Sequence, residues 1–246
     1  MQENPFISVV VPVYNEALTI ETTINRIEAE RYRKEIILVD DGSDDGTTEL
    51  LRNRTQSTSK DCSIQFVRHR TNLGKGAAVW TGFRHARGEF VIIQDADLEY
   101  NPSDYSKLLA PLINGEADAV YGSRFLNRKS SLSLHFLGNK MLTMLSNLCT
   151  GFCLTDMETG YKAFRSELLS RISLREDGFG FEPEITAELA GLQARVVEVP
   201  ITYRRRGYRA GKKLKWKDGF AAPFFILRYN LERCFGFSRR TGSIAG

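Results

Sequence analysis

The sequence contains few of the residues that build disulfide frameworks or zinc sites. Four cysteines and three histidines occur among 246 residues. Only Cys149 and Cys153 lie near each other, and no second cysteine pair or histidine cluster accompanies them. We therefore expect buried thiols in a reducing compartment, not a metal-bound or disulfide-linked fold.

Long apolar runs are also missing. No stretch approaches the roughly 18 apolar residues of a spanning helix, and Phe220 to Leu227 is short and contains Pro223. The N-terminus, MQENPFISVVVP, has no basic segment followed by a long apolar one, so no signal peptide is predicted. We expect a chain that does not itself cross a membrane.

The common nucleotide and calcium motifs are absent as well. The chain has neither GxxxxGK[ST] nor GxGxxG, and no EF-hand loop. A P-loop or dinucleotide-binding fold is therefore disfavoured.

Charge is distributed unevenly along the chain. The net charge is +4, but residues 204–240 carry twelve Lys/Arg and only two acids. The remainder is acidic. This segregation indicates an anionic partner for the C-terminal part, whether phosphate, lipid surface or nucleic acid.

Short β-branched runs alternate with helical segments in the first half. This pattern predicts an α/β fold with a mostly parallel central sheet and helices on both faces. The expected strands are Ile7–Val13, Glu35–Asp40, Ile64–Arg68, Phe90–Gln94 and Ala119–Tyr121, and the expected helices are Ala17–Glu30, Thr47–Arg54, Lys75–Ala86 and Pro102–Ile113. Further along, helices are expected at Leu137–Leu148 and Glu182–Leu189, and extended chain at Thr155–Phe164 and Arg195–Tyr203. We expect one domain over residues 1–203 and a basic, aromatic segment over residues 204–246.

The predicted strands end in unusual loops. These are VPVYNE, VDDGSDDGT, RTNLGKGAA and QDADLE. Ligands of open parallel sheets bind at the carboxyl ends of the strands, so these loops are candidate site segments. VDDGSDDGT also fits an ordinary turn with a helix cap. NLGKGAA fits either a glycine turn or a phosphate site with Lys75.

Asp95, Asp97 and Glu99 are spaced two apart directly after a buried strand. In an extended chain their side chains would point the same way. Carboxylates that close repel one another unless a cation lies among them, and all-oxygen ligation suits Mg²⁺ or Mn²⁺. A solvated acidic loop is the alternative.

Together the four loops resemble the family 2 glycosyltransferases, which have the GT-A nucleotide-sugar (Rossmann-like) fold. Within that family the sequence looks closest to the polyprenyl-phosphate (dolichol-phosphate-type) mannose and glucose synthases. The supporting matches are GSRF at Gly122–Phe125, TDMETGYKAFR at Thr155–Arg165, FGFEPEI at Phe179–Ile185 and the basic RGYRAGKKLKWKDG segment. The resemblance implies an inverting transfer of a hexose from a UDP- or GDP-sugar to a polyprenyl phosphate.

The resemblance also implies roles for single residues of the donor site. Pro12, Tyr14 and Glu16 would line the nucleoside pocket, and Asp41 would hydrogen-bond the base. Lys75 would bind the donor phosphates. Asp95 and Asp97 would hold the cation and the donor, with Glu99 at a third position where the mannose synthases tend to have Gln.

On the acceptor side, Arg124 is the first candidate for binding a lipid phosphate, because a guanidinium fits phosphate bidentately. The other implied acceptor residues are His135, Asn139, Arg206, Lys212 and Lys213. A lipid phosphate is already anionic and requires no strong base. A hydroxyl acceptor of a saccharide or protein would need one, and Asp156 or Glu158 would then serve, although both also fit a plain loop.

The last 43 residues interleave aromatic with basic side chains. We expect an amphipathic helix on the cytosolic face of a membrane, binding peripherally or with a separate membrane protein. Packing on the body or in a homo-oligomer is the alternative, and nucleic acid is disfavoured because no RNA-binding motif is present. A non-catalytic nucleotide-sugar-binding module is a third hypothesis.

Overall fold

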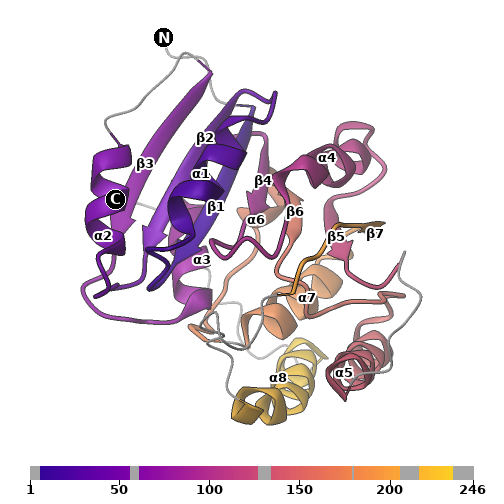
Figure 1. Cartoon of the computed structure of the whole chain (residues 1–246). Coiled ribbons are helices and arrows are strands. Elements are labelled where there is room, and N and C mark those ends of the chain that lie inside the picture. Colours follow the sequence, from indigo (N-terminus) through magenta and orange to yellow (C-terminus); the bar gives the residue numbers. More distant parts are fainter. Residues whose placement is uncertain (1–5, 56–60, 127–133, 179, 206–215, 235–246) are drawn as a thin grey trace.

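A seven-stranded sheet forms the centre of the molecule (Figure 1). The computed structural model describes residues 6–55, 61–126, 134–178, 180–205 and 216–234. The strand order is β3-β2-β1-β4-β6-β5-β7, and β6 alone runs antiparallel to its neighbours. The strands are β1 (Ile7–Val13), β2 (Lys34–Asp40), β3 (Cys62–Arg68), β4 (Phe90–Ile93), β5 (Ala119–Ser123), β6 (Lys162–Arg165) and β7 (Val196–Pro200). The predicted mostly parallel α/β fold is confirmed.

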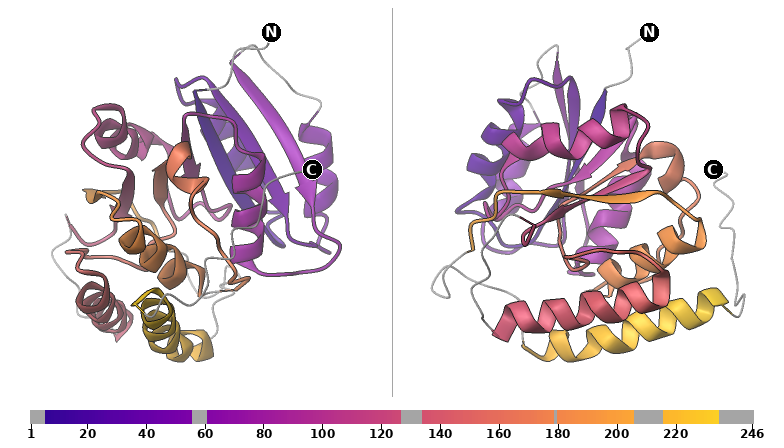
Figure 2. Two further views of the ribbon diagram at one scale, coloured as in Figure 1. Left: turned by 180° about the vertical axis from the view of Figure 1, so that it is seen from behind. Right: turned by 90° about the vertical axis from the view of Figure 1, so that its right-hand side faces the viewer.

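Helices cover both faces of this sheet. They are α1 (Ile20–Glu28), α2 (Thr47–Arg54), α3 (Lys75–His85), the 3-10 turn η1 (Pro102–Asp104), α4 (Tyr105–Ile113), α5 (Leu134–Thr150), α6 (Ser166–Leu169), α7 (Phe181–Gly191) and α8 (Trp216–Cys234). Helices α1, α2 and α4 pack on one face, and α3, α6 and α7 pack on the other. Helices α5 and α8 lie side by side outside α7 (Figure 2).

The first strand explains why the apolar runs are continuous and not alternating. Val9 and Val11 of β1 point into the core under α1, whereas Val10 points into the core under α3. All three are fully buried. A parallel strand covered on both faces needs apolar side chains in both directions.

Two expectations about extended chain need correction. Residues 155–161 form no strand, and β6 begins only at Lys162. The polar backbone of this segment bonds elsewhere, since the amides of Thr155 and Asp156 donate to the Glu198 carboxylate at 2.7 and 2.9 Å. The last strand, β7, ends at Pro200, and Tyr203 instead forms an isolated antiparallel bridge with Tyr100. The expectation of buried thiols holds for Cys62 and is wrong for Cys153, which is exposed.

The predicted C-terminal helix exists as α8, with Pro223 inside it. It packs against α5 and α7. Among the described residues, no helix combines the length and apolar character that a membrane span requires.

Candidate active site

The ends of β1 and β2 hold the first two site loops together. Val13 and Asp40 are register partners in neighbouring strands, so the following residues leave the sheet side by side. The amide of Asn15 donates to Ser43 Oγ at 2.9 Å, and the amide of Glu16 donates to Thr47 Oγ1 at 2.9 Å. Hydroxyls of the second loop therefore fix the backbone of the first. Three predicted donor residues, Pro12, Tyr14 and Glu16, lie half-buried here.

Asp41 is buried and shapes the glycine-rich loop. Its Oδ1 accepts from the Leu73 amide at 2.9 Å and lies 2.7 Å from His69 Nδ1, and its Oδ2 accepts from the Gly74 amide at 2.8 Å. Gly74 has a φ of 111° and precedes α3, a conformation that favours glycine. Asp41 thus orients the backbone at the start of α3. Its predicted bond to a base stays a prediction.

Lys75, the first residue of α3, lies between two carboxylates. Its Nζ is 3.0 Å from Asp95 Oδ1 and 3.4 Å from Glu182 Oε1. Burial opposes the charge, but these two acids raise the pKa of Lys75 above its usual value. Gly160 closes over the pair, because a Cβ there would lie 2.6 Å from Asp95 Oδ2 and 2.9 Å from Lys75 Nζ. A side chain at position 160 would displace the ion pair.

The segment after β4 turns, which makes the extended-chain expectation for its three carboxylates wrong. Leu98 has a φ of 62°, and the Glu99 amide donates to Asp97 Oδ1 at 3.1 Å. Glu99 is directed away, since its Oε2 accepts from the Tyr203 hydroxyl at 2.7 Å. In the part of the chain that the structure describes, no three His, Cys, Asp or Glu side chains gather at metal-binding distance.

A divalent cation still fits the residues present. Mg²⁺ and Mn²⁺ are commonly held by one or two carboxylates together with substrate phosphates and water. Asp95 and Asp97 are partly exposed at the carboxyl edge of the sheet. They offer hard oxygen donors that such an ion prefers, whereas Glu99 is occupied by Tyr203.

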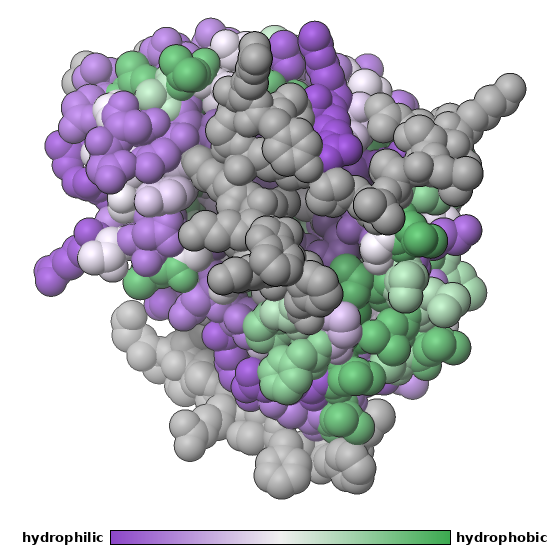
Figure 3. Space-filling model, turned by 60° about the horizontal axis from the view of Figure 1, so that its bottom comes forward, coloured by the Kyte–Doolittle hydropathy of each residue, from purple (hydrophilic) through white to green (hydrophobic). Residues whose placement is uncertain are grey.

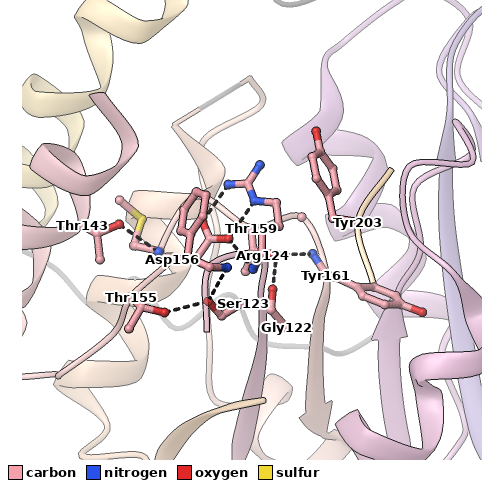
Figure 4. Close-up of polar contacts among 12 residues, drawn as sticks. Gly122, Ser123, Arg124, Thr143, Thr155, Asp156, Thr159, Tyr161 and Tyr203 are labelled. Carbon is pink, nitrogen blue, oxygen red and sulfur yellow. Dashed lines mark hydrogen bonds and ion pairs between the residues drawn. The ribbon is translucent and has the colours of Figure 1, made fainter. Parts of the chain in front are cut away.

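Arg124 and Asp156 form a buried, bidentate ion pair (Figure 4). Arg124 Nε and Nη2 lie 2.7 Å from the two carboxylate oxygens, and the Arg124 amide donates to the same group at 3.0 Å. The guanidinium also lies 5.4 Å from the ring centroids of Phe125 and Tyr203. Side-chain exposure is 13% for Arg124 and 0% for Asp156. The arginine is held rigidly at the end of β5.

Glu158 and Lys162 follow Asp156 on the same segment. Burial and the neighbouring charge of Glu182 raise the pKa of Glu158 to about 8. Burial lowers the pKa of Lys162 to about 8. The sequence analysis treated Glu158 as a base or as part of a plain loop, and it did not predict Lys162, Glu182 or Tyr203 as site residues. FGFEPEI was the available signal for Glu182, because an acid within an apolar run indicates a buried partner.

Of the remaining acceptor candidates, the structure describes the side chain of Asn139. Asn139 is half-buried on α5. Helix α5 is tied to the site because Phe136 packs edge-on against Phe125, with ring centroids 4.9 Å apart. The side chain of His135, and Arg206, Lys212 and Lys213 altogether, lie outside the described residues.

Residues 8–173 match the family model described as "Glycosyl transferase family 2". Among curated proteins, the chain is 32% identical to an undecaprenyl-phosphate mannosyltransferase of Micrococcus luteus, with 80% of this chain and 83% of that protein covered. It is 31% identical to a dolichol-phosphate mannosyltransferase of Pyrococcus furiosus, with 90% of this chain but 63% of that protein covered. The chain therefore spans less than two thirds of the Pyrococcus protein.

Among solved structures, the fold is similar to glucosyl-3-phosphoglycerate synthase of Mycobacterium tuberculosis in complex with Mn²⁺ and UDP-glucose. The TM-score is 0.69 at 22% identity, with 94% of this chain and 79% of that chain covered. At this identity the likeness concerns the fold alone.

Proposed function

Because the chain belongs to glycosyl transferase family 2, we propose that it transfers a hexose, with inversion, from a UDP- or GDP-sugar to a polyprenyl phosphate. Two relatives carry names of this activity, with mannose as the sugar. One observation carries the proposal for this chain. A largely buried guanidinium held by two hydrogen bonds, that of Arg124, lies at the strand edge that also bears the donor-binding residues Lys75 and Asp95.

The acceptor would be bound by the arginine side that Asp156 leaves uncovered. Asp156 contacts Nε and Nη2 of Arg124, so the two N–H groups of Nη1 and the second N–H of Nη2 remain to meet phosphate oxygens. The phosphate attacks the anomeric carbon as an anion and needs no base. The Arg124 side chain is already held in place by Asp156, so little side-chain entropy is lost when it orients the acceptor phosphate. This lowers the activation barrier of the transfer.

Negative charge develops on the departing nucleoside diphosphate. Lys75 lies where it can stabilise that charge, and stabilisation greater in the transition state than in the ground state raises the rate. A divalent ion held by Asp95 and Asp97, Mg²⁺ or Mn²⁺, would supply further charge neutralisation when bound. Solved structures of similar fold contain Mn²⁺ with UDP, which supports this assignment.

A hydroxyl acceptor is less well supported. It would need a carboxylate base, and both oxygens of Asp156 are already bound by Arg124. Glu158 keeps its proton at neutral pH because its pKa is raised to about 8, so it is not a ready base either.

We also propose peripheral attachment to a membrane through α5 and α8. Their shared outer surface is apolar (Figure 3). The exposed residues recur at helical spacing on one side of each helix: Leu137, Met141, Met144 and Leu148 on α5, and Phe224, Leu227 and Leu231 on α8. Exposed Lys140 and Arg228 lie among them in sequence, which suits an anionic bilayer. We call these seven residues the apolar face.

The test is transfer by purified protein with Mg²⁺ or Mn²⁺. UDP-glucose, UDP-GlcNAc, UDP-galactose and GDP-mannose would each be given with undecaprenyl or dolichyl phosphate in detergent. We expect a glycolipid from at least one donor and none when the lipid phosphate is replaced by the free lipid alcohol. Turnover of no donor, or equal transfer to the alcohol, would reject the proposal.

A further inference from the structure

Residues 156–160 join the donor site to the acceptor site and carry two charged residues, the buried Asp156 and the half-buried Glu158. At one end Asp156 binds Arg124. At the other, Gly160 packs against the Lys75–Asp95 ion pair. Glu158 lies midway between these ends. Figure 4 shows the Arg124 end of this segment.

The Oε1 atom of Glu158 is buried and has no hydrogen-bond partner among the described residues. Leaving a buried polar atom without a partner is costly, so native proteins rarely do so without a reason. Lys162 does not satisfy the atom. Its Nζ donates to the carbonyls of Met157 and Thr159 and lies 4.6 Å from the Tyr121 ring centroid.

The protonated state of Glu158 suits a hydroxyl partner. Four charged groups act on it: Glu182 and Asp156 favour the neutral acid, while Lys162 and Arg124 oppose it, and burial outweighs all of them. A neutral carboxyl both donates and accepts a hydrogen bond. A sugar hydroxyl has the same two capacities.

The geometry of the reaction places the sugar here. In the proposed transfer the anomeric carbon must lie between the donor diphosphate and the acceptor phosphate. Lys75 and Asp95 lie on the first side and Arg124 on the second, and residues 156–160 connect the two, so we expect the hexose to lie along this segment. Glu158 is the residue of this segment with an unpartnered polar atom.

We propose that Glu158 binds a hydroxyl of an uncharged donor hexose and that Glu158 together with Glu182 disfavours uronic acids. The charges support selectivity. With Glu158 neutral, the carboxylates of Asp95, Asp156 and Glu182 are matched by the cations Lys75, Arg124 and Lys162. A sugar carboxylate would add unmatched negative charge beside Glu182, and like charges at a binding site are an effective means of exclusion. This inference rests on the proposed function for the identity of the donor.

The test measures binding without any acceptor. Calorimetry with MnCl₂ would give the affinities of UDP, UDP-glucose, UDP-glucuronic acid, GDP and GDP-mannose for the wild-type protein, Glu158→Leu and Glu158→Gln. For whichever nucleotide binds, UDP or GDP, we expect Glu158→Leu to weaken the affinity for the nucleotide sugar about tenfold relative to the affinity for the free diphosphate, as loss of one hydrogen bond predicts. Glu158→Gln keeps a donor and an acceptor and should remain within about threefold of wild type. UDP-glucuronic acid should bind about tenfold or more weakly than UDP-glucose.

Proton dependence separates binding from a purely structural role. In the wild-type protein, the affinity for the nucleotide sugar relative to that for the free diphosphate should fall as the pH rises through the pKa of Glu158, about 8. This fall should be absent in Glu158→Gln. Glu35→Gln is the matched control. Glu35 is a buried acid near the start of β2 that accepts hydrogen bonds from the Ser8 hydroxyl and the Arg87 amide, and its replacement should not change the affinity for any nucleotide sugar relative to that for the free diphosphate.

Three results would overturn the inference: equal affinity for the two UDP-sugars, a parallel loss of diphosphate and sugar affinity in Glu158→Leu, or the same pH dependence in Glu158→Gln as in wild type. Absence of nucleotide binding would overturn both proposals. Sugar-dependent binding without transfer to lipid phosphate would reject the proposed function alone.

Discussion

The two halves of the sheet's carboxyl edge hold their charged side chains in different ways. At the ends of β1 and β2, buried carboxylates are bound mainly by neighbouring amides and hydroxyls, as Asp40 is by the Ser43 amide and the Thr48 hydroxyl. Around β4, β5 and the segment before β6, carboxylates instead meet cations from distant parts of the chain, as in Arg124–Asp156.

The loops after β1 and β2 are therefore shaped by contacts within the protein, whereas the charged side chains around β4 and β5 can also bind a ligand. A carboxylate satisfied by backbone amides has a fixed partner, and its loop is rigid. A cation paired with one carboxylate can also bind a second anion, such as phosphate, on another side. The first half is therefore suited to holding a nucleoside, and the second to binding groups whose charge changes during reaction.

The largest expected effect comes from removing one partly exposed acid of the second half, Asp97. Asp97→Asn should lower kcat by about 10²–10³-fold, the usual cost of removing one group that stabilises developing charge, with little change in folding because Asp97 is partly exposed. Steady-state transfer rates and urea unfolding measure the two effects. Asp118→Asn, at the opposite edge of the sheet, is the control. Equal rates for wild type and Asp97→Asn would show that this acid has no part in catalysis.

The chain contains two arginine–aspartate pairs of the same geometry in different surroundings. Arg195 contacts Asp118 through its amide, Nε and Nη2 at 2.9, 3.1 and 2.7 Å, much as Arg124 contacts Asp156. However, the side chain of Arg195 is 57% exposed and that of Arg124 only 13%. Burial is the main difference between the pairs, although Arg195 Nη1 also donates to the Gly115 carbonyl and Arg124 lies beside two aromatic rings.

Arg124→Leu should destabilise the protein by about 3–5 kcal/mol, because it leaves Asp156 buried without its cation. Arg195→Leu should change stability little, since exposed pairs contribute little. Urea unfolding of both single variants, and of Arg124→Leu/Asp156→Leu, measures this. The double variant should recover part of the loss. Similar losses at both arginines would contradict the role assigned to burial.

The same contrast explains what the sequence could predict. The strands, most helices and the loops at the strand ends are signalled locally by apolar runs and by Asp, Gly and Ser clusters. The pairing of Arg124 with Asp156, or of Lys75 with Glu182, joins positions 32 and 107 residues apart and depends on packing that no local pattern specifies. The turn at Leu98 was missed for a related reason: the residue has a φ of 62°, which its side chain disfavours.

Glu158 makes stability depend on pH in a direction opposite to that of an ordinary paired acid. Its pKa is raised from 4.5 to about 8, so between these values the folded state binds more protons than the unfolded state. Stability therefore falls as pH rises from about 5 to 8. Lys162 adds no slope in this window, because it is protonated in both states below its folded pKa of about 8.

Glu158→Gln should make this fall shallower by on the order of 2 kcal/mol. Glu184, whose pKa burial raises to about 7, retains part of the slope. Unfolding in urea at pH 5, 6, 7 and 8 measures the effect. An identical slope in wild type and Glu158→Gln would mean that Glu158 is ionised at neutral pH.

The smallest expected effect concerns the apolar face, which lies outside the strand edge but begins at Leu137, the neighbour of Phe136, which packs on Phe125. Leu148 on α5 is 77% exposed, so Leu148→Glu should leave stability unchanged. It should weaken binding to phosphatidylcholine/phosphatidylglycerol vesicles about tenfold, because a leucine buried in the interface contributes about 1.5 kcal/mol or more. Cosedimentation measures binding, and Ile113→Glu, 49% exposed on α4, is the control. A protein that is dimeric without lipid, and that Leu148→Glu makes monomeric, would instead assign this face to a second copy of the chain. The apolar face would then be an assembly surface. A face covered by a second copy of the chain cannot at the same time contact the bilayer that holds the polyprenyl phosphate.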